Sequence, residues 1–421
     1  MADQTMSPPA LAGKWTTGEI ASDPRVGFLL ALGRASHAAG HHSQTLEDLL
    51  DRTAARLGVT EAQFFTTPTS IFAAFGAEST QRTYLIRVEP GGPDLGRLVR
   101  IEEILEAVLA GRLTPLDGAG RLRDVAVSAA PRGPLITTLA FALSSAASAV
   151  FLGGGAKEVA LAGGLGLLTG ALALLARHSP ALGRIFSAAA SFVVALLAGV
   201  IGALGLGVSV STATLAGLIV LLPGLMIVSA MRELATGHLS SGTARAAGSF
   251  IVLIGIGFGV ALGTRAAELL AGPAAHAAAL PLPTASVWIA VIVSAVGFTI
   301  LLHADWRDAP WIVLGAAVAL LASRAGGRGL GLELAPFLGS FAVALVAAIY
   351  ARATRRPAEV VLAPGVLVLV PGSIGFRSIT ALLDHQVVSG IDEAFTALFT
   401  GIALVAGLLI ASVVLPGEQG E

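Results

Sequence analysis

The sequence contains no cysteine, so disulfide bonds and thiolate metal sites are excluded. It is also poor in charge, because 13% of its residues are Asp, Glu, Lys or Arg, against about 25% in ordinary soluble domains. The formal net charge of −1 gives no electrostatic basis for binding nucleic acid. A chain of 421 residues with so little charge does not form one large water-soluble core, so we expect lipid to surround most of it.

Long apolar segments occupy most of the chain, and hydrophobic residues make up 55% of it. A membrane-spanning helix needs roughly 17–25 predominantly apolar residues. We predict about ten such spans, within a range of nine to eleven, at 135–153, 157–176, 185–207, 213–231, 245–264, 285–303, 308–324, 333–351, 359–377 and 392–415. The predicted fold class is an α-helical polytopic membrane protein.

Charged residues crowd into the first part of the chain, which indicates a small domain ahead of the membrane region. After a tail at 1–22, residues 23–131 show helical and strand patterns separated by turn residues. Helices are expected from Asp23 and over 43–57, 95–109 and 115–127, and strands over 63–67, 70–75 and 83–88. Ser43 is the expected N-cap of the second helix. No signal-peptide-like run precedes this α+β domain, so we expect it to be cytoplasmic.

An internal repeat divides the membrane region. Leu215–Gly224 reads LAGLIVLLPG and Ala363–Gly372 reads APGVLVLVPG, and a Ser-Gly pair follows each Pro-Gly at the same distance. The two Pro-Gly pairs lie 148 positions apart, from Pro223 to Pro371. This offset carries five spans onto five, and an odd number of spans inverts the second half relative to the first.

We therefore predict two inverted five-helix repeats, at 132–276 and 277–416, followed by a tail at 417–421. The arginines favour the loops on the side of the N-terminal domain, which predicts a cytoplasmic N-terminus. The abundance of Ala and Gly, with 51 glycines, is typical of GC-rich bacterial coding. The expected location is thus the bacterial cytoplasmic (inner) membrane.

Proline and glycine inside spans mark the candidate substrate site. Proline removes a backbone donor, and the freed carbonyls are tolerated in a membrane only against protein or a watery cavity. Interrupted helices at corresponding positions of two repeats are typical of transporter binding sites. For the prolines, the alternative interpretation is a simple kink of the helix. For Arg377, the alternative is that its side chain only extends to the membrane interface. The predicted substrate-binding residues are Pro223, Gly224, Pro364, Gly365, Pro371, Gly372, Ser373 and Arg377.

Ionisable residues lie at the ends of the spans, and no Asp or Glu lies in the middle of one. Asp384, His385 and Asp392 are therefore the predicted proton-coupling residues on the outer side. His37, His41 and His42 include a ligand-like spacing, but Gly40 interrupts the helix between them and a solvated turn is the favoured interpretation. We predict no metal, no cofactor and no catalytic residues.

Three short motifs in the first domain carry a family resemblance. They are Gly40–Glu47 (GHHSQTLE), Thr67–Ile71 (TPTSI) and Asp94–Leu98 (DLGRL). Together with the Pro-Gly motifs they make residues 26–415 resemble the threonine/serine exporter family, although Thr45 stands where an Arg is common in that family. The resemblance implies a cytoplasmic domain before ten spans, and proton-driven export of threonine and serine by an antiporter. The resemblance also extends to exporters of succinate, so export of a small dicarboxylate is the alternative.

Two other classes of protein fit the sequence less well. A membrane sensor does not need ten repeated spans, and a membrane hydrolase needs clustered His, Asp or Ser residues that no motif here supplies. The expected partners are a small polar solute, protons and the lipid bilayer. Assembly into a homo-oligomer and the role of the first domain stay open.

Overall fold

The computed structural model describes residues 23–77, 79–89, 91–128, 132–274, 277–329, 331, 334–369, 371–383 and 385–415. The expected tails at 1–22 and 417–421, and the predicted proton-coupling residue Asp384, lie outside the described residues.

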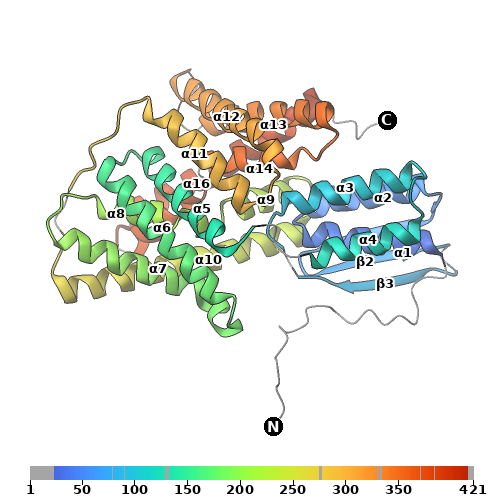
Figure 1. The fold of residues 1–421 in the computed structure, drawn as a ribbon, viewed down its shortest axis with the longest axis horizontal. Helices are drawn as coiled ribbons and strands as arrows, with labels where there is room; N and C mark the ends of the chain where they lie inside the picture. Colours follow the sequence, from blue (N-terminus) through green and yellow to red (C-terminus); the bar gives the residue numbers. More distant parts are fainter. Residues whose placement is uncertain are drawn as a thin grey trace, which may run out of the picture.

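The first domain has the predicted α+β composition. Its elements are α1 (Pro24–Ala38), α2 (Ser43–Arg56), β1 (Ala62–Thr67), β2 (Ser70–Phe75), β3 (Arg82–Arg87), α3 (Leu95–Leu109) and α4 (Pro115–Val127). The strands form an antiparallel sheet in the order β1-β2-β3, and the four helices lie on one of its faces (Figure 1). Side chains alternate across the sheet, so Ile71 and Ala73 are buried whereas Phe72 between them is exposed.

Polar caps fix where these helices begin. Asp23, Asp94 and Thr114 each accept a hydrogen bond from a backbone N–H in the first turn of α1, α3 and α4, respectively. The prediction for α2 was wrong by one residue, because His42 is its N-cap and Ser43 is its first helical residue. The N–H and hydroxyl of Ser43 have partners in the membrane region instead, as described below.

The rest of the chain is helical. The elements are α5 (Pro134–Phe151), α6 (Ala156–Ala176), α7 (Pro180–Ala203), α8 (Val210–Gly217), η1 (Ile219–Leu221), α9 (Gly224–Ala235), α10 (Leu239–Ala271), α11 (Ser286–Leu301), η2 (Trp306–Asp308), α12 (Ala309–Gly329), α13 (Ala335–Thr354), α14 (Glu359–Val368), α15 (Pro371–Leu383) and α16 (Val387–Val414). By length and composition, eight helical segments in the described part of the chain can cross a membrane, with Glu359–Leu383 taken as one. The bent pair of Val210–Gly217 and Ile219–Ala235 makes nine.

The chain is therefore a multi-pass membrane protein. Helix α11 is apolar but only 16 residues long, which is shorter than a typical span of about 20 residues. The total of ten spans depends on α11 and stays a prediction.

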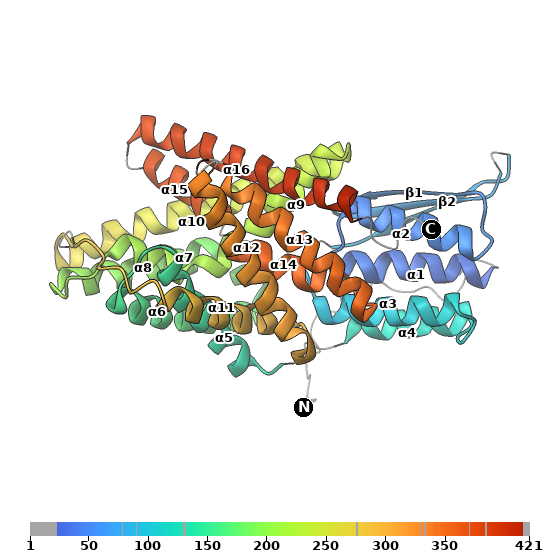
Figure 2. The same ribbon diagram turned by 90° about the horizontal axis from the view of Figure 1, so that it is seen from above.

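Two pairs of consecutive helices, α9 with α10 and α15 with α16, each form a helical hairpin that follows a Pro-Gly motif. The turns of these two hairpins lie at opposite ends of the helix bundle. The first domain packs against one end, where the turn between α9 and α10 meets it. Helices α15 and α16 are joined at the far end, from which α16 runs back toward the first domain (Figure 2). Equivalent elements of the predicted repeats thus point in opposite directions along the long axis of the molecule.

Glycines make matching helix contacts in the two halves. Gly259 of α10 lies against Ala188 and Ser191 of α7, and Gly407 of α16, 148 positions later, lies against α13. The α13 atoms belong to Phe337 and Ser340, each 149 positions after its counterpart in α7. Both glycines let the backbones of two long helices approach closely.

Candidate functional site

The predicted interruption of the first-half helix lies at Pro223. Helix α8 ends at Gly217, the short turn η1 follows, and α9 begins at Gly224 after Pro223. Pro223 has φ −79° and ψ 44°, and the amide of Gly224 donates to the carbonyl of Leu222 over 2.8 Å, which is close to an inverse γ-turn. The 48° bend of this span lies earlier, at Leu218, between the pieces Val210–Gly217 and Ile219–Ala235.

Hydroxyl groups from neighbouring helices satisfy part of the interrupted backbone. The carbonyl of Gly217 accepts hydrogen bonds from Ser145 Oγ of α5, at 3.4 Å, and from Thr169 Oγ1 of α6, at 3.3 Å. A buried carbonyl without such donors would be costly in lipid.

The chain segments around Pro223-Gly224 and Pro371-Gly372 approach each other closely. A methyl group on Gly372 of α15 would lie 3.3 Å from the amide nitrogen of Gly224 and 3.0 Å from Cβ of Leu222. Pro223, Gly224, Gly372 and Ser373 are all buried, and Pro371 is the first residue of α15. The structure therefore brings together the chain segments that contain five of the predicted substrate-binding residues.

Pro364 and Gly365 lie elsewhere. Helix α14 runs through Pro364 without a break and ends at Val368, so the expected unwinding at Pro364 is wrong. Gly365 instead packs closely against Val343 of α13, where a larger side chain would overlap it. A proline can stay helical when neighbouring helices enclose the freed carbonyl.

The remaining predicted residues lie on the far hairpin. The side chain of Arg377 is 56% exposed and lies 3.9 Å from the carboxylate of Glu393. His385 is exposed in the turn after α15, with φ +59°, and Asp392 is exposed on α16. Their roles in substrate binding and proton coupling stay predictions.

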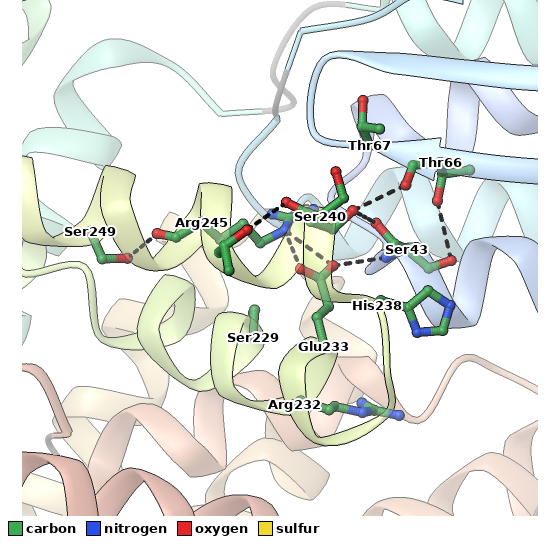
Figure 3. Close-up of polar contacts among 12 residues, drawn as sticks. Ser43, Thr66, Thr67, Ser229, Arg232, Glu233, His238, Ser240, Arg245 and Ser249 are labelled. Atoms are coloured by element: carbon green, nitrogen blue, oxygen red, sulfur yellow. Dashed lines mark hydrogen bonds and ion pairs between the residues drawn. The ribbon is translucent and has the colours of Figure 1, made fainter.

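A buried polar junction joins the first domain to the hairpin of α9 and α10 (Figure 3). Glu233, at the end of α9, is 0% exposed. Its Oε1 accepts a hydrogen bond from the backbone N–H of Ser43 over 2.9 Å, and Arg245 Nε lies 3.1 Å from Oε2. The carboxylate from the membrane region thus binds the free amide at the N-terminus of α2, where a negative charge is favourable.

Hydroxyls extend this junction into β1. Ser43 Oγ donates to Ser241 Oγ over 2.7 Å, and Ser241 Oγ donates to the carbonyl of Thr66 over 3.0 Å. Glu47 accepts from both the N–H and the hydroxyl of Thr66, and its other oxygen lies 3.3 Å from His238 Nε2. A cavity of about 260 Å³ adjoins this network between β1 and the start of α10.

The sequence suggested that the histidines of the first domain lie in a solvated turn, and the structure shows that this prediction was wrong. His37 and His41 are 3% and 8% exposed, and His37 Nε2 lies 3.1 Å from the carbonyl of Thr67. Burial lowers the pKa of His37 and of His41. Burial, assisted by the charges of Arg232 and Arg245, holds the pKa of His42 well below its ordinary value. Neutral imidazoles are therefore the favoured form at this junction.

A second contact joins the first domain to the turn after α11. Asp94 Oδ2 lies 3.1 Å from His303 Nδ1, and the amide of Leu95 donates to the carbonyl of Leu302 over 2.9 Å. Burial raises the pKa of Asp94, but hydrogen bonds from His303 and from the N–H of Arg97 outweigh it, so the pKa lies below its ordinary value. His303 adopts φ +57°, which is uncommon for a residue other than glycine.

These contacts account for much of the sequence pattern in the first domain. Ser43 and Glu47 belong to the first motif and Asp94 to the third, and all three contact the membrane region or a residue that does. The sequence did not reveal the part played by Glu233, which it showed only as an ionisable residue at a helix end. The Ser-Gly pair of the internal repeat was the feature of the sequence that could have indicated a role for Ser241.

Comparison with known proteins gives consistent matches along the chain. A family model described as threonine/serine exporter matches residues 27–267, and a second, described as Threonine/Serine exporter, ThrE, matches residues 287–414. The chain is 27% identical over 338 residues to the threonine/serine exporter of Corynebacterium glutamicum, covering 75% of this chain and 66% of that protein. It is 24% identical over 374 residues to the probable threonine/serine exporter of Mycobacterium tuberculosis, covering 82% and 68%.

Similarity extends to fungi. The chain is 26% identical over 383 residues to pheromone-regulated membrane protein 10 of Candida albicans, covering 87% of this chain and 34% of that protein. It thus spans about a third of the fungal relative and about two thirds of the two bacterial ones. No solved structure shows significant similarity to it.

Proposed function

The chain belongs to the threonine/serine exporter family, and from that premise we propose that it exports threonine and serine in exchange for protons. The proposed location is the bacterial cytoplasmic membrane, with the first domain in the cytosol and ten spans in two inverted halves. The short helix α11 completes the count of ten.

The observation that carries the proposal is the contact between Gly224 and Gly372. These residues occupy equivalent positions of the two repeats, 148 apart, and equivalent residues touch only where they lie next to the symmetry axis. Interrupted helices that meet on such an axis are typical of the midplane site of secondary transporters. The matching glycine contacts of α10 and α16, and the opposite directions of the two hairpins (Figure 2), also support two inverted halves.

The chemistry at this crossing suits a small neutral amino acid. The groups that an interrupted helix offers are backbone amides and carbonyls, which bind the carboxylate and ammonium of a zwitterion without a buried protein charge. Ser373 adds a hydroxyl beside Gly372. Arg377, on the outer hairpin, would meet the substrate as it leaves, and His385, Asp392 and Asp384 would exchange protons with the outer solution.

Flux through the reconstituted protein tests the proposal. Purified full-length chain in liposomes is supplied with labelled threonine, serine or succinate, with and without an imposed pH gradient. We expect flux of threonine and serine that requires the gradient and is abolished by a protonophore. Succinate flux alone would assign the chain to dicarboxylate export, and flux no faster than in empty vesicles for all three would reject the proposed substrates.

A further inference from the structure

The first domain bridges the two halves of the membrane region on one side. Ser43, Glu47 and Thr66 bind the hairpin of α9 and α10, which belongs to the first half. Asp94 and Leu95 bind the turn after α11, which belongs to the second half. If the two halves move apart on this side, the first domain must stay with one half and lose its contact with the other.

The contact with the second half has an apolar continuation. One cluster of buried side chains runs from the helices of the first domain into α11, α12, α13, α14 and α16. From the first half it includes buried Val228, and the partly buried Phe151, Leu225 and Met231 pack against it. Arg132, just before α5, also donates to the carbonyls of Thr299 and Ala304 beside this contact. Opening it would expose apolar surface to water, which is unfavourable.

The contact with the first half is polar and adjoins space for water. Ser43 and Thr66 make hydrogen bonds to the hairpin (Figure 3). Glu47 adds an ion pair with His238. The adjoining cavity of about 260 Å³ is lined by Thr66, Gly237, His238, Ser240 and Ser241, and by the apolar side chains of Phe65 and Leu239. Water entering from this cavity can replace hydrogen bonds that are broken, so separation costs less here than in an apolar contact.

Among the residues that the structure describes, no domain covers the equivalent hairpin at the far end (Figure 2). Glu393 of α16 lies 148 positions after Arg245 of α10 and has the opposite charge. It pairs with Arg377 at the surface, whereas the pair of Arg245 and Glu233 is enclosed beneath the first domain. Of the two hairpins, the one held by the first domain is the one that would have to move when the inner side opens.

We infer that the first domain is an inner latch: it is anchored to the second half and releases the hairpin of α9 and α10 in each transport cycle. The latch consists of Ser43, Glu47 and Thr66 on the first domain and Glu233, His238, Ser241 and Arg245 on the hairpin. The structure has the latch closed. This inference rests on the proposed transport function and assigns the first domain a gating role within it.

The absence of cysteine from the chain makes a direct test available. The oxygens of Ser43 and Ser241 are 2.7 Å apart, so Ser43→Cys with Ser241→Cys places two sulfurs near bonding distance. In liposomes, the oxidised double variant should lose threonine flux to the level of empty vesicles, and a reductant should restore it. Mass spectrometry of the linked peptides measures how much disulfide has formed.

The anchor supplies the matched control. Asp94→Cys with His303→Cys, joined by a short bifunctional thiol reagent, should transport equally well before and after crosslinking. A disulfide at the latch that leaves flux unchanged, or a crosslink at the anchor that stops it, would overturn the inference. Absence of flux in the wild-type chain would instead overturn the proposed function, so the two failures are distinguishable.

A second readout needs no substitution. Peptide-resolved hydrogen exchange on the wild-type chain should show faster exchange around Ser43 during turnover than without substrate, because its N–H loses Glu233 whenever the latch opens. The peptide that contains Leu95 should keep its protection. Equal protection of the Ser43 peptide in both conditions would contradict the latch even if the cysteine variants failed to fold.

Discussion

At the scale of single residues, Glu233 is a carboxylate removed from water whose two partners come from two other elements. Glu233 lies in the last turn of α9, Arg245 comes from α10, and the N–H of Ser43 comes from α2 in another domain. A buried charge is tolerated only with such compensation, and removing one partner leaves the others unpaired. The junction is therefore sensitive to single substitutions.

Glu233→Ala should lower the free energy of unfolding by about 3–5 kcal/mol, because Arg245 and the Ser43 amide lose their buried partner. Glu268→Ala is the matched control: Glu268 pairs with Arg265 over 2.6 Å, but the two side chains are 39% and 72% exposed. An exposed pair contributes about 0–1 kcal/mol. Denaturation of both variants in the same detergent measures the two losses in free energy of unfolding. Equal losses would show that Glu233 is not stabilised by Arg245 and the Ser43 amide as described.

His42 makes the junction sensitive to acid. Burial and two nearby arginines hold its pKa well below the ordinary 6.5 in the folded chain, whereas the unfolded chain binds a proton near 6.5. The unfolded state therefore binds more protons below that pH, and the folded state loses stability as the pH falls through about 6.5. His42→Asn should flatten this dependence between about pH 7 and 5.5, as seen in thermal unfolding of the full chain. A slope unchanged by the substitution would contradict the assignment.

At the scale of elements, α9 and α15 meet so closely that an added methyl group would require its neighbours to shift by a few tenths of an ångström. A methyl group on Gly372 would press on Gly224 and Leu222, so Gly372→Ala should move the two half-helices apart. We expect threonine flux to fall by about tenfold or more, since small displacements at a binding site have large effects on rate. Gly248→Ala in α10 is the control, because nothing lies within 4 Å of the added methyl. Equal flux in the two variants would place the substrate elsewhere.

The elements of the first domain were predictable because local signals define them. Helices α3 and α4 begin and end where the sequence indicated, since Asp94 and Thr114 cap them and glycine or proline residues delimit them. The start of α2 was misjudged for a reason that the local sequence does not contain. A serine at the start of a helix usually serves as the N-cap of that helix. Ser43 is instead paired with residues 190 and 198 positions away.

The interruptions of the spans were only partly predictable. The pair of Pro-Gly motifs 148 positions apart pointed to Gly224 and Gly372, and these residues do touch. Pro364 carries the same local chemistry and stays within a helix, because its surroundings decide whether a proline unwinds one. Nothing in the local sequence separates the two cases.

At the scale of the whole molecule, the number of spans determines whether the two halves are inverted or parallel. Ala235 at the end of α9 and Leu383 at the end of α15 are 148 positions apart, and both are exposed. Five candidate spans separate them if the 16-residue α11 crosses the membrane, and four if it does not. An odd number places them on opposite sides of the membrane, and an even number on the same side.

Single cysteines at these positions decide between the two, since the chain has no others. We expect Leu383→Cys to react with a membrane-impermeant maleimide added to intact cells, and Ala235→Cys to react only in inverted vesicles, where the cytosolic face is outside. Each variant serves as the other's control for reagent access. Labelling of both from one side would mean that α11 does not span and that the halves are parallel, in which case the contact of Gly224 with Gly372 would need an explanation other than an axis in the membrane plane.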